Sequence, residues 1–220
     1  MPCCAECEGI EQEFDAKRAA SRLRKWRRKG PDRTTQMLIE DVQAALGNGA
    51  GRNRTLLDIG GGVGAIHHLL LEHNVDRATH VDASSAYLAA AREETLRVGH
   101  ADRVDFMRGD FVEVAERVPP ADVVTLDRVI CCYHDMPRLV ARSAERARRL
   151  YGAVFPRDAW YTRASIDIEN AYFRLKGSSF RSFLHPPRDI DAVLRENGLE
   201  RRSVRRTMAW EVTVYERRAR

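Results

Sequence analysis

The stretch Leu56-Leu57-Asp58-Ile59-Gly60-Gly61-Gly62-Val63-Gly64 decides the fold. Residues 55–59 are apolar enough for a short buried strand, and residues 63–73 follow with apolar positions at helical spacing. Glycines between a strand and a helix permit a tight turn and let the backbone approach a ligand closely. The stretch therefore predicts a ligand-binding loop at the carboxyl end of a strand.

The same alternation of short apolar runs and helical patterns continues to residue 155. It predicts strands at residues 55–59, 79–82, 104–107, 122–126 and 150–155, separated by helices at 63–73, 85–97 and 136–148. This alternation is typical of a parallel sheet with helices on both faces. A helix at 187–197 precedes strands at 199–206 and 210–216, which lie too close in sequence for a helical crossover. The predicted fold class is α/β, a doubly wound, mostly parallel seven-stranded sheet with a C-terminal antiparallel strand pair.

Two further segments flank or interrupt this pattern. Residues 1–50 are predicted to form an N-terminal helical cap, with one charged helix over residues 8–29 and a second over residues 34–46. Residues 51–220 are predicted to form the main domain, with an inserted lid segment at about 156–186 that is helical around 166–176. We expect the first helix to close over the ligand loop, with Lys29-Gly30-Pro31 as its hinge.

Acidic residues recur at or near the ends of the predicted strands. Asp58 lies within the first strand, Asp82 ends the second, Asp110 follows the third and Asp127 ends the fourth. At the end of the second strand a carboxylate can accept hydrogen bonds from ribose hydroxyls. Because the carboxyl ends of parallel strands share one edge of a sheet, the four residues favour a single nucleoside-binding site.

Together these motifs resemble the class I S-adenosylmethionine-dependent methyltransferases of the bacterial small-molecule type. Residues 56–64 look like motif I, Asp82-Ala83-Ser84 like motif II, and residues 122–127 like motif IV. The resemblance covers roughly residues 50–155 and the last two strands, and it implies S-adenosyl-L-methionine as the cofactor. It implies a set of cofactor-binding residues, namely Asp58, Gly60, Gly62, Gly64, Asp82, Ala83, Asp110, Phe111 and Asp127. In such enzymes Gly60 and Gly62 would line the methionine part, Asp82 the ribose, Asp110 and Phe111 the adenine, and Asp127 the region near the methyl group.

The residues after motif IV are candidates for catalysis. His134 could act as a general base near neutral pH, and Tyr133 could orient the acceptor. Alternatively, His134 and Asp135 begin the next helix. Methyl transfer depends mostly on holding acceptor and methyl in line, and a base is needed only when the acceptor carries a proton. The stretch Asp127-Arg128-Val129-Ile130 departs from the Asp/Asn-Pro-Pro-aromatic motif of nucleic-acid amino-methyltransferases, which disfavours base methylation.

The inserted segment carries aromatic and basic side chains. These are Trp160, Tyr161, Tyr172, Phe173, Phe180 and Phe183, with Arg157, Arg163, Arg174 and Arg181. Aromatic rings with guanidinium groups suit a flat or apolar acceptor that has an anionic group. Packing of the rings against the sheet edge is the alternative. The layout is similar to bacterial small-molecule methyltransferases, and loosely to the magnesium-protoporphyrin carboxyl methyltransferases.

Net charge and the basic stretch Arg22–Lys29 leave three functions open. The formal net charge is +5, from 37 basic and 32 acidic residues. The basic stretch could bind RNA, clamp an acidic substrate, or be a solvated helix face.

The first hypothesis for the function of the chain is methylation of a small molecule on oxygen, sulfur or nitrogen, and nucleic acid is not expected as a partner. An RNA-directed methyltransferase and a non-catalytic cofactor-binding module are the alternatives. Oligomeric state stays open.

The cysteines and histidines do not suggest a metal site. The chain has five cysteines in two clusters, Cys3, Cys4 and Cys7 in one and Cys131 and Cys132 in the other. An odd number in two tight clusters does not indicate a disulfide framework, and it suits a reducing compartment. The first cluster has the spacing of half a zinc site, but no second pair follows. His67 and His68 lack an i, i+4 partner. The chain has neither an apolar run of about 20 residues nor a secretory signal pattern, so we expect a cytoplasmic protein with no membrane span.

Overall fold

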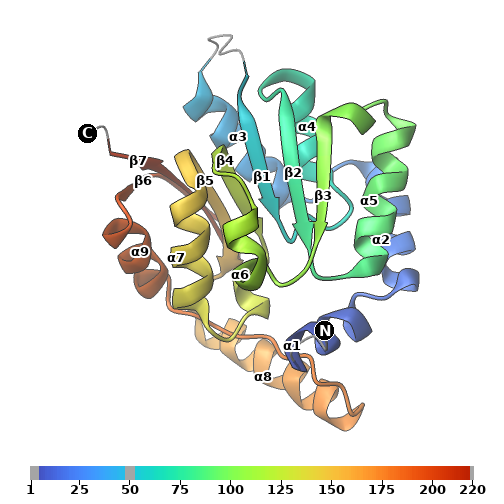
Figure 1. The fold of residues 1–220 in the computed structure, drawn as a ribbon. Coiled ribbons are helices and arrows are strands. Elements are labelled where there is room, and N and C mark those ends of the chain that lie inside the picture. The colour runs from blue at the N-terminus through green and yellow to red at the C-terminus, as the bar shows by residue number, and fades with distance from the viewer. Residues whose placement is uncertain (1–4, 48–52, 219–220) are drawn as a thin grey trace.

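The computed structural model describes residues 5–47 and 53–218 (Figure 1). One seven-stranded sheet runs through it in the order β3-β2-β1-β4-β5-β7-β6. The strands are β1 (Thr55–Ile59), β2 (Arg77–Asp82), β3 (Val104–Arg108), β4 (Ala121–Asp127), β5 (Ala147–Pro156), β6 (Leu199–Arg206) and β7 (Trp210–Arg217). β1 to β5 are parallel, whereas β7 is antiparallel to both β5 and β6. The predicted fold class is confirmed.

Helices cover both faces of the sheet because its central strands are apolar on both sides. In β4, Val123 packs with α3 (Arg33–Leu46) and α4 (Ala65–His73), on the face that also carries α5 (Ser85–Arg97). Val124 and Leu126 pack into the opposite cluster, with α6 (Phe111–Val114), α7 (Met136–Arg146) and α9 (Pro187–Glu196). Short 3-10 turns occur at Ala101–Arg103, Ala115–Arg117 and Ile130–Cys132. The carboxyl edge of the parallel strands is left for a site.

The N-terminal segment differs from the single helix predicted over residues 8–29. It forms α1 (Ala5–Glu13) and α2 (Ala16–Lys29), separated at Phe14 and Asp15. Asp15 caps α2 by accepting a hydrogen bond from Arg18 N, and such a cap marks a helix start. The Phe14 ring packs edge-on against Tyr87 and Phe180. The break therefore lies at a partly buried aromatic ring that packs between α5 and the segment after α8.

The inserted segment contains α8 (Trp160–Leu175), which begins six residues earlier than the predicted helix start at residue 166. In Figure 1, α1 and α8 lie below the carboxyl edge of the sheet. Gly9 of α1 touches the chain after α8, since a Cβ there would lie 2.7 Å from Phe180 N. In residues 5–47 and 53–218, no helix is both long and apolar enough to cross a membrane. Cys3 and Cys4 lie outside the described residues, so the half zinc site stays untested.

The packing of α3 on β5 gives a stability prediction. Leu38 is fully buried, and its Cδ1 would lie 2.7 Å from a Cβ built at Gly152. Leu38→Ala should lower the free energy of unfolding by about 2–5 kcal/mol in urea denaturation, because it leaves a cavity. Leu96→Ala is the control, since Leu96 is 70% exposed and the change should cost less than about 0.5 kcal/mol. Equal losses in the two variants would contradict this account of the core.

Candidate active site at the carboxyl edge of the sheet

A cavity of about 460 Å³ opens where the strand order reverses between β1 and β4. Open α/β sheets bind ligands at this position, and the volume lies within the usual range of small-molecule sites. Its floor comes from the loop after β1 and the ends of the neighbouring strands. The residues predicted to bind cofactor that line it are Gly60, Gly62, Ala83, Phe111 and the three aspartates Asp82, Asp110 and Asp127. The structure thus gathers seven of the nine predicted residues.

The glycine loop adopts a backbone that other residues rarely tolerate. Gly60 and Gly62 have φ values of 60° and 59°, in the left-handed region. A Cβ at Gly60 would lie 2.5 Å from Val129 Cγ2, so the loop also has no room for one there. Gly64, with φ of 88°, caps α4 instead and is buried over the His67 ring. Among the described residues, Gly64 is not part of the cavity lining.

Asp82 ties the glycine loop to the end of β2. Its Oδ2 accepts a hydrogen bond from Gly62 N at 3.0 Å, and its Oδ1 accepts one from Ser84 N at 2.9 Å. Burial raises the pKa of Asp82 to about 6. A carboxylate can accept about four hydrogen bonds, so Asp82 keeps capacity for hydroxyl groups in the cavity.

Asp110 and Tyr133 form a second polar group on the cavity wall. Asp110 caps α6, where its Oδ1 accepts a hydrogen bond from Val112 N at 2.9 Å. Its Oδ2 accepts a hydrogen bond from the Tyr133 hydroxyl at 3.0 Å. Both side chains line the cavity beside the Phe111 ring. The structure therefore brings Tyr133, Asp110 and Phe111 together on one wall of the cavity.

The structure does not bring His134 to this cavity. Its side chain is exposed and stacks on the Tyr133 ring at 5.7 Å between centroids, and the described lining includes Tyr133 without His134. The next residue, Asp135, caps α7 by accepting a hydrogen bond from Arg138 N. The chain therefore leaves the cavity edge at Tyr133, as in the alternative in which His134 and Asp135 begin the helix.

Asp58 is also absent from the described lining. It is fully buried beneath the glycine loop, where its Oδ1 accepts a hydrogen bond from the Thr125 hydroxyl at 2.8 Å. A Cβ at Gly61 would lie 2.5 Å from Asp58 Oδ2. Side chains of a strand point alternately to the two faces of the sheet. The Asp58 side chain therefore points to a helix-covered face, where it contacts the loop, and not into the cavity at the edge of the sheet.

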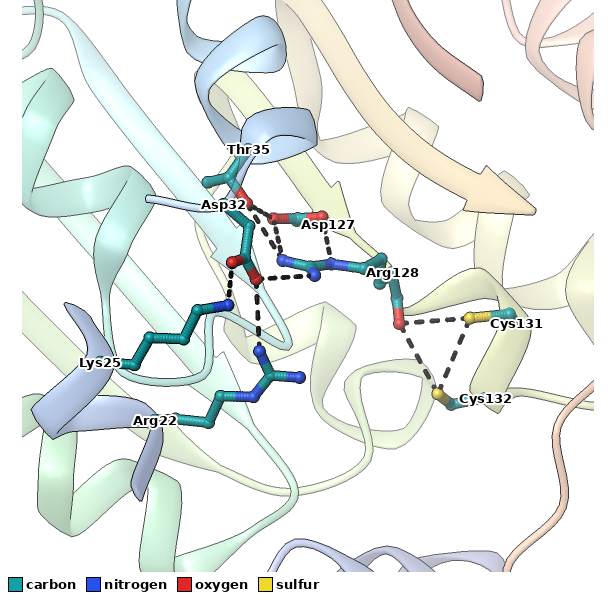
Figure 2. Close-up of polar contacts among 8 residues, drawn as sticks. All are labelled: Arg22, Lys25, Asp32, Thr35, Asp127, Arg128, Cys131 and Cys132. Carbon is teal, nitrogen blue, oxygen red and sulfur yellow. Dashed lines mark hydrogen bonds and ion pairs between the residues drawn. The ribbon is translucent and has the colours of Figure 1, made fainter. Parts of the chain in front are cut away.

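An ion-pair network joins the end of β4 to the N-terminal helices (Figure 2). Arg128 directs its guanidinium to Asp127 at 3.0 Å and to Asp32 at 3.1 Å. Figure 2 shows Lys25 and Arg22 of α2 reaching the same Asp32. Burial acts to lower the pKa of Arg128, but the neighbouring carboxylates more than offset it and raise that pKa. We name these residues, with Thr35, the latch.

Sequence reasoning missed the latch, although each member stands near a recognised feature. Asp32 follows the Gly30-Pro31 break, and Arg128 follows motif IV. Arg128 has a φ of 62°, which is uncommon for a residue other than glycine. Residues 32 and 128 are far apart in the sequence, and no sequence pattern predicts that they meet. Their contact becomes visible only in the folded structure.

The rest of the lining comes from α2, α8 and the segment after α8. Arg18, Arg22 and Lys25 supply cationic groups, and Phe173 and Phe180 supply aromatic rings. Of the side chains singled out in the inserted segment, these two rings are the described ones that reach the cavity; Trp160 and Tyr172 are exposed. Cys131 and Cys132 line the cavity as well, with sulfur atoms 3.9 Å apart.

A family model described as an O-methyltransferase domain matches residues 6–154. The chain belongs to this family. The predicted S-adenosylmethionine-dependent methyltransferase class is thereby confirmed. No curated protein matches the chain in sequence.

Solved structures share the fold across nearly the whole chain. Magnesium protoporphyrin IX methyltransferase from Synechocystis PCC 6803, with bound SAH, has a TM-score of 0.70 at 17% identity, covering 95% of this chain and 98% of that one. An O-methyltransferase family protein from Burkholderia thailandensis has a TM-score of 0.71 at 19% identity, covering 94% and 62%. Geranyl diphosphate C-methyltransferase from Streptomyces coelicolor A3(2) has a TM-score of 0.64 at 14% identity, covering 83% and 77%. Because these names indicate different acceptors, the shared fold does not identify the acceptor of this chain.

The latch gives a prediction for stability. Asp32 accepts hydrogen bonds from three cationic side chains, and its own side chain is 26% exposed. Asp32→Ala should lower the free energy of unfolding by about 1–3 kcal/mol in urea denaturation, a range for charge-assisted bonds that solvent partly screens. The control Glu72→Ala removes an exposed carboxylate of α4 and should cost less than about 0.5 kcal/mol. An unchanged free energy in Asp32→Ala would show that the latch does not hold α2.

Proposed function

We propose that this chain transfers the methyl group of S-adenosylmethionine to a small-molecule acceptor held beside the latch. The observation that carries the proposal is that the glycine loop, Asp82 and Asp110 face one cavity, which α2 and α8 complete. Carboxylates at the ends of β2 and β3 beside a loop with no side chains fit a ligand with a ribose and a base. The family and the resemblance to motifs I, II and IV support the same assignment.

The residues divide the cavity between cofactor and acceptor. We assign the methionine part to the backbone of Gly60 and Gly62, the ribose to Asp82, and the adenine to Asp110 and Phe111. This assignment rests on the resemblance and on the position of each residue in the lining. Asp58 and Gly64 support the loop from below in this proposal and do not contact the cofactor.

Catalysis would then depend on positioning more than on a base. When bound, S-adenosylmethionine would supply an electrophilic methyl group on a sulfonium, for in-line transfer to an acceptor lone pair with S-adenosylhomocysteine as the leaving group. Tyr133 is held by Asp110, and Asp127 by Arg128, so both side chains present fixed surfaces to the acceptor. His134 lies outside the cavity wall, so we assign it no role in the methyl transfer.

The acceptor end favours an aromatic or apolar molecule with an anionic group. Phe173 and Phe180 line the cavity and pack edge-on against each other, and Arg18 and Lys25 bring positive charge to the lining. A substrate anion would share these cations with Asp32 and Glu13, their partners within the chain. The names of the similar structures do not decide among oxygen, nitrogen and sulfur as the methylated atom.

The RNA-directed alternative is less well supported. Arg27 is paired with Glu93 and Glu94 at 2.7 Å each, and Arg22 and Lys25 are paired with Asp32. Cations that are already paired within the chain contribute less to phosphate binding, because their own partners must be displaced. Three of the six basic side chains in residues 22–29 therefore hold α2 in place within the chain.

The ribose assignment gives a binding prediction. Asp82→Ala should weaken binding of S-adenosylmethionine by about 1.5–3 kcal/mol, or roughly 10- to 150-fold in Kd, since hydrogen bonds to a charged group are lost. Isothermal titration calorimetry measures this directly. Asp105→Ala is the matched control on β3, where the side chain is 71% exposed, and its affinity should equal that of the parent. An Asp82→Ala variant with parental affinity would place the ribose elsewhere.

A further inference from the structure

Three polar side chains meet beneath the glycine loop, outside the cavity. Asp58 of β1, His67 of α4 and His80 of β2 are each 0% exposed. The parallel pairing of β1 with β2 places Asp58 and His80 in register, and α4 brings His67 over them. Ligand atoms of the three side chains lie within 4.8 Å of one another. These residues form what we call the triad.

The triad leaves a buried carboxylate oxygen without a partner. The Thr125 hydroxyl donates to Asp58 Oδ1, but Asp58 Oδ2 has no hydrogen-bond partner among the described residues. A buried carboxylate is costly unless a cation or hydrogen-bond donors compensate it. The nearest candidate, His67 Nδ1, lies 3.8 Å away and faces His80 Nδ1 at 3.1 Å. A hydrogen bond between the two rings alone would leave Oδ2 uncompensated.

We propose that the triad binds one divalent transition-metal ion of the zinc type through three protein ligands, directly beneath the cofactor loop. Two imidazoles and one carboxylate are a known ligand set for such ions. Tetrahedral ligands at about 2.0–2.1 Å from zinc stand roughly 3.3–3.5 Å apart. Two of the three separations in the triad, 3.1 Å between the His67 and His80 Nδ1 atoms and 3.8 Å between His67 Nδ1 and Asp58 Oδ2, bracket that range, and all three lie within 4.8 Å.

One contact around the triad is of the kind that supports metal ligands, whereas the Nε2 atoms of His67 and His80 have no hydrogen-bond partner among the described residues. The Thr125 hydroxyl fixes the carboxylate orientation, as outer-shell partners do for metal ligands. A second histidine pair, His68 and His100, stands beside the triad with Nδ1 atoms 3.3 Å apart.

The triad also touches the loop that would hold the cofactor. A Cβ at Gly61 would lie 2.6 Å from His80 Cε1, and one at Gly64 would lie 2.4 Å from His67 Cε1. An ion that fixes these rings would therefore fix the surface on which the loop rests. The proposal differs from the sequence prediction of no metal because His67 has its partners on β1 and β2, where helical spacing does not reveal them.

Metal analysis of the purified protein tests the proposal. The experiment uses a Cys3→Ser/Cys4→Ser/Cys7→Ser background, which removes the N-terminal thiols as competing ligands. The protein is expressed with added Zn²⁺ and dialysed. Inductively coupled plasma mass spectrometry should then find about one zinc ion per chain. Asp58→Asn and His80→Gln should each lower this content to about one-tenth or less, because each removes one of three protein ligands. His100→Gln, outside the triad, should keep it.

A second readout keeps the test independent of variant folding. Co²⁺ in place of Zn²⁺ should give visible d–d absorption without a thiolate charge-transfer band, and circular dichroism reports whether each variant is folded. Folded parent protein with no stoichiometric metal would overturn the proposal. So would a metal content that Asp58→Asn and His80→Gln leave unchanged, because the ion would then lie elsewhere. Neither result depends on the methyl acceptor or on cofactor binding.

Discussion

The backbone of the glycine loop is confined from two sides, and the remainder of the site depends on this confinement. Val129 lies against Gly60 from one side, and Asp58 and His80 lie against Gly61 from the other. The Gly62 amide is then held by the Asp82 carboxylate at 3.0 Å. Gly60 and Gly61 leave no room for a side chain. The Gly60 amide also donates a hydrogen bond to the Val81 carbonyl at 2.7 Å, so the loop backbone is held in one position at the edge of the cavity. The binding site is therefore formed before a ligand arrives.

The latch completes the cavity from the opposite direction. The sheet alone would leave an open edge, and α2 covers it because Arg22 and Lys25 meet Arg128 at Asp32. The same ion pairs hold Asp127 at the end of β4, near the proposed position of the methyl group. Closure of the cavity and orientation of its innermost carboxylate thus share one set of contacts. The Gly30-Pro31 turn connects α2 to α3, and the apolar side chains of α3 are buried in the core.

Much of the fold could be predicted because it follows from local patterns. Strand β1 begins and ends as predicted. The short apolar run is bounded by Arg54 on one side and by glycines on the other, so its limits are visible in the sequence. The α5 bounds also agreed, because Ser84 caps the helix by accepting a hydrogen bond from Tyr87 N. The break at Phe14 was missed, since the charged sequence around it continues the helical spacing and the aromatic partners lie far along the chain.

The candidate site was predictable where residues follow strands and unpredictable where distant segments meet. Asp82 and Asp110 were found because the carboxyl ends of parallel strands share one edge. Asp32 with Arg128, and His67 with His80, come together through packing across the fold. His134 was chosen because a histidine after motif IV has suitable chemistry, but the sequence does not show that its side chain is exposed and outside the described cavity lining.

The central claim is that this cavity binds S-adenosylmethionine. Calorimetric titration of the purified protein with S-adenosylmethionine and, separately, with NADH tests it most directly. The account predicts binding of the first at roughly micromolar Kd, or about −8 kcal/mol, with no heat from the second. Binding of NADH, or of neither compound, would contradict the assignment of the glycine loop and everything built on it.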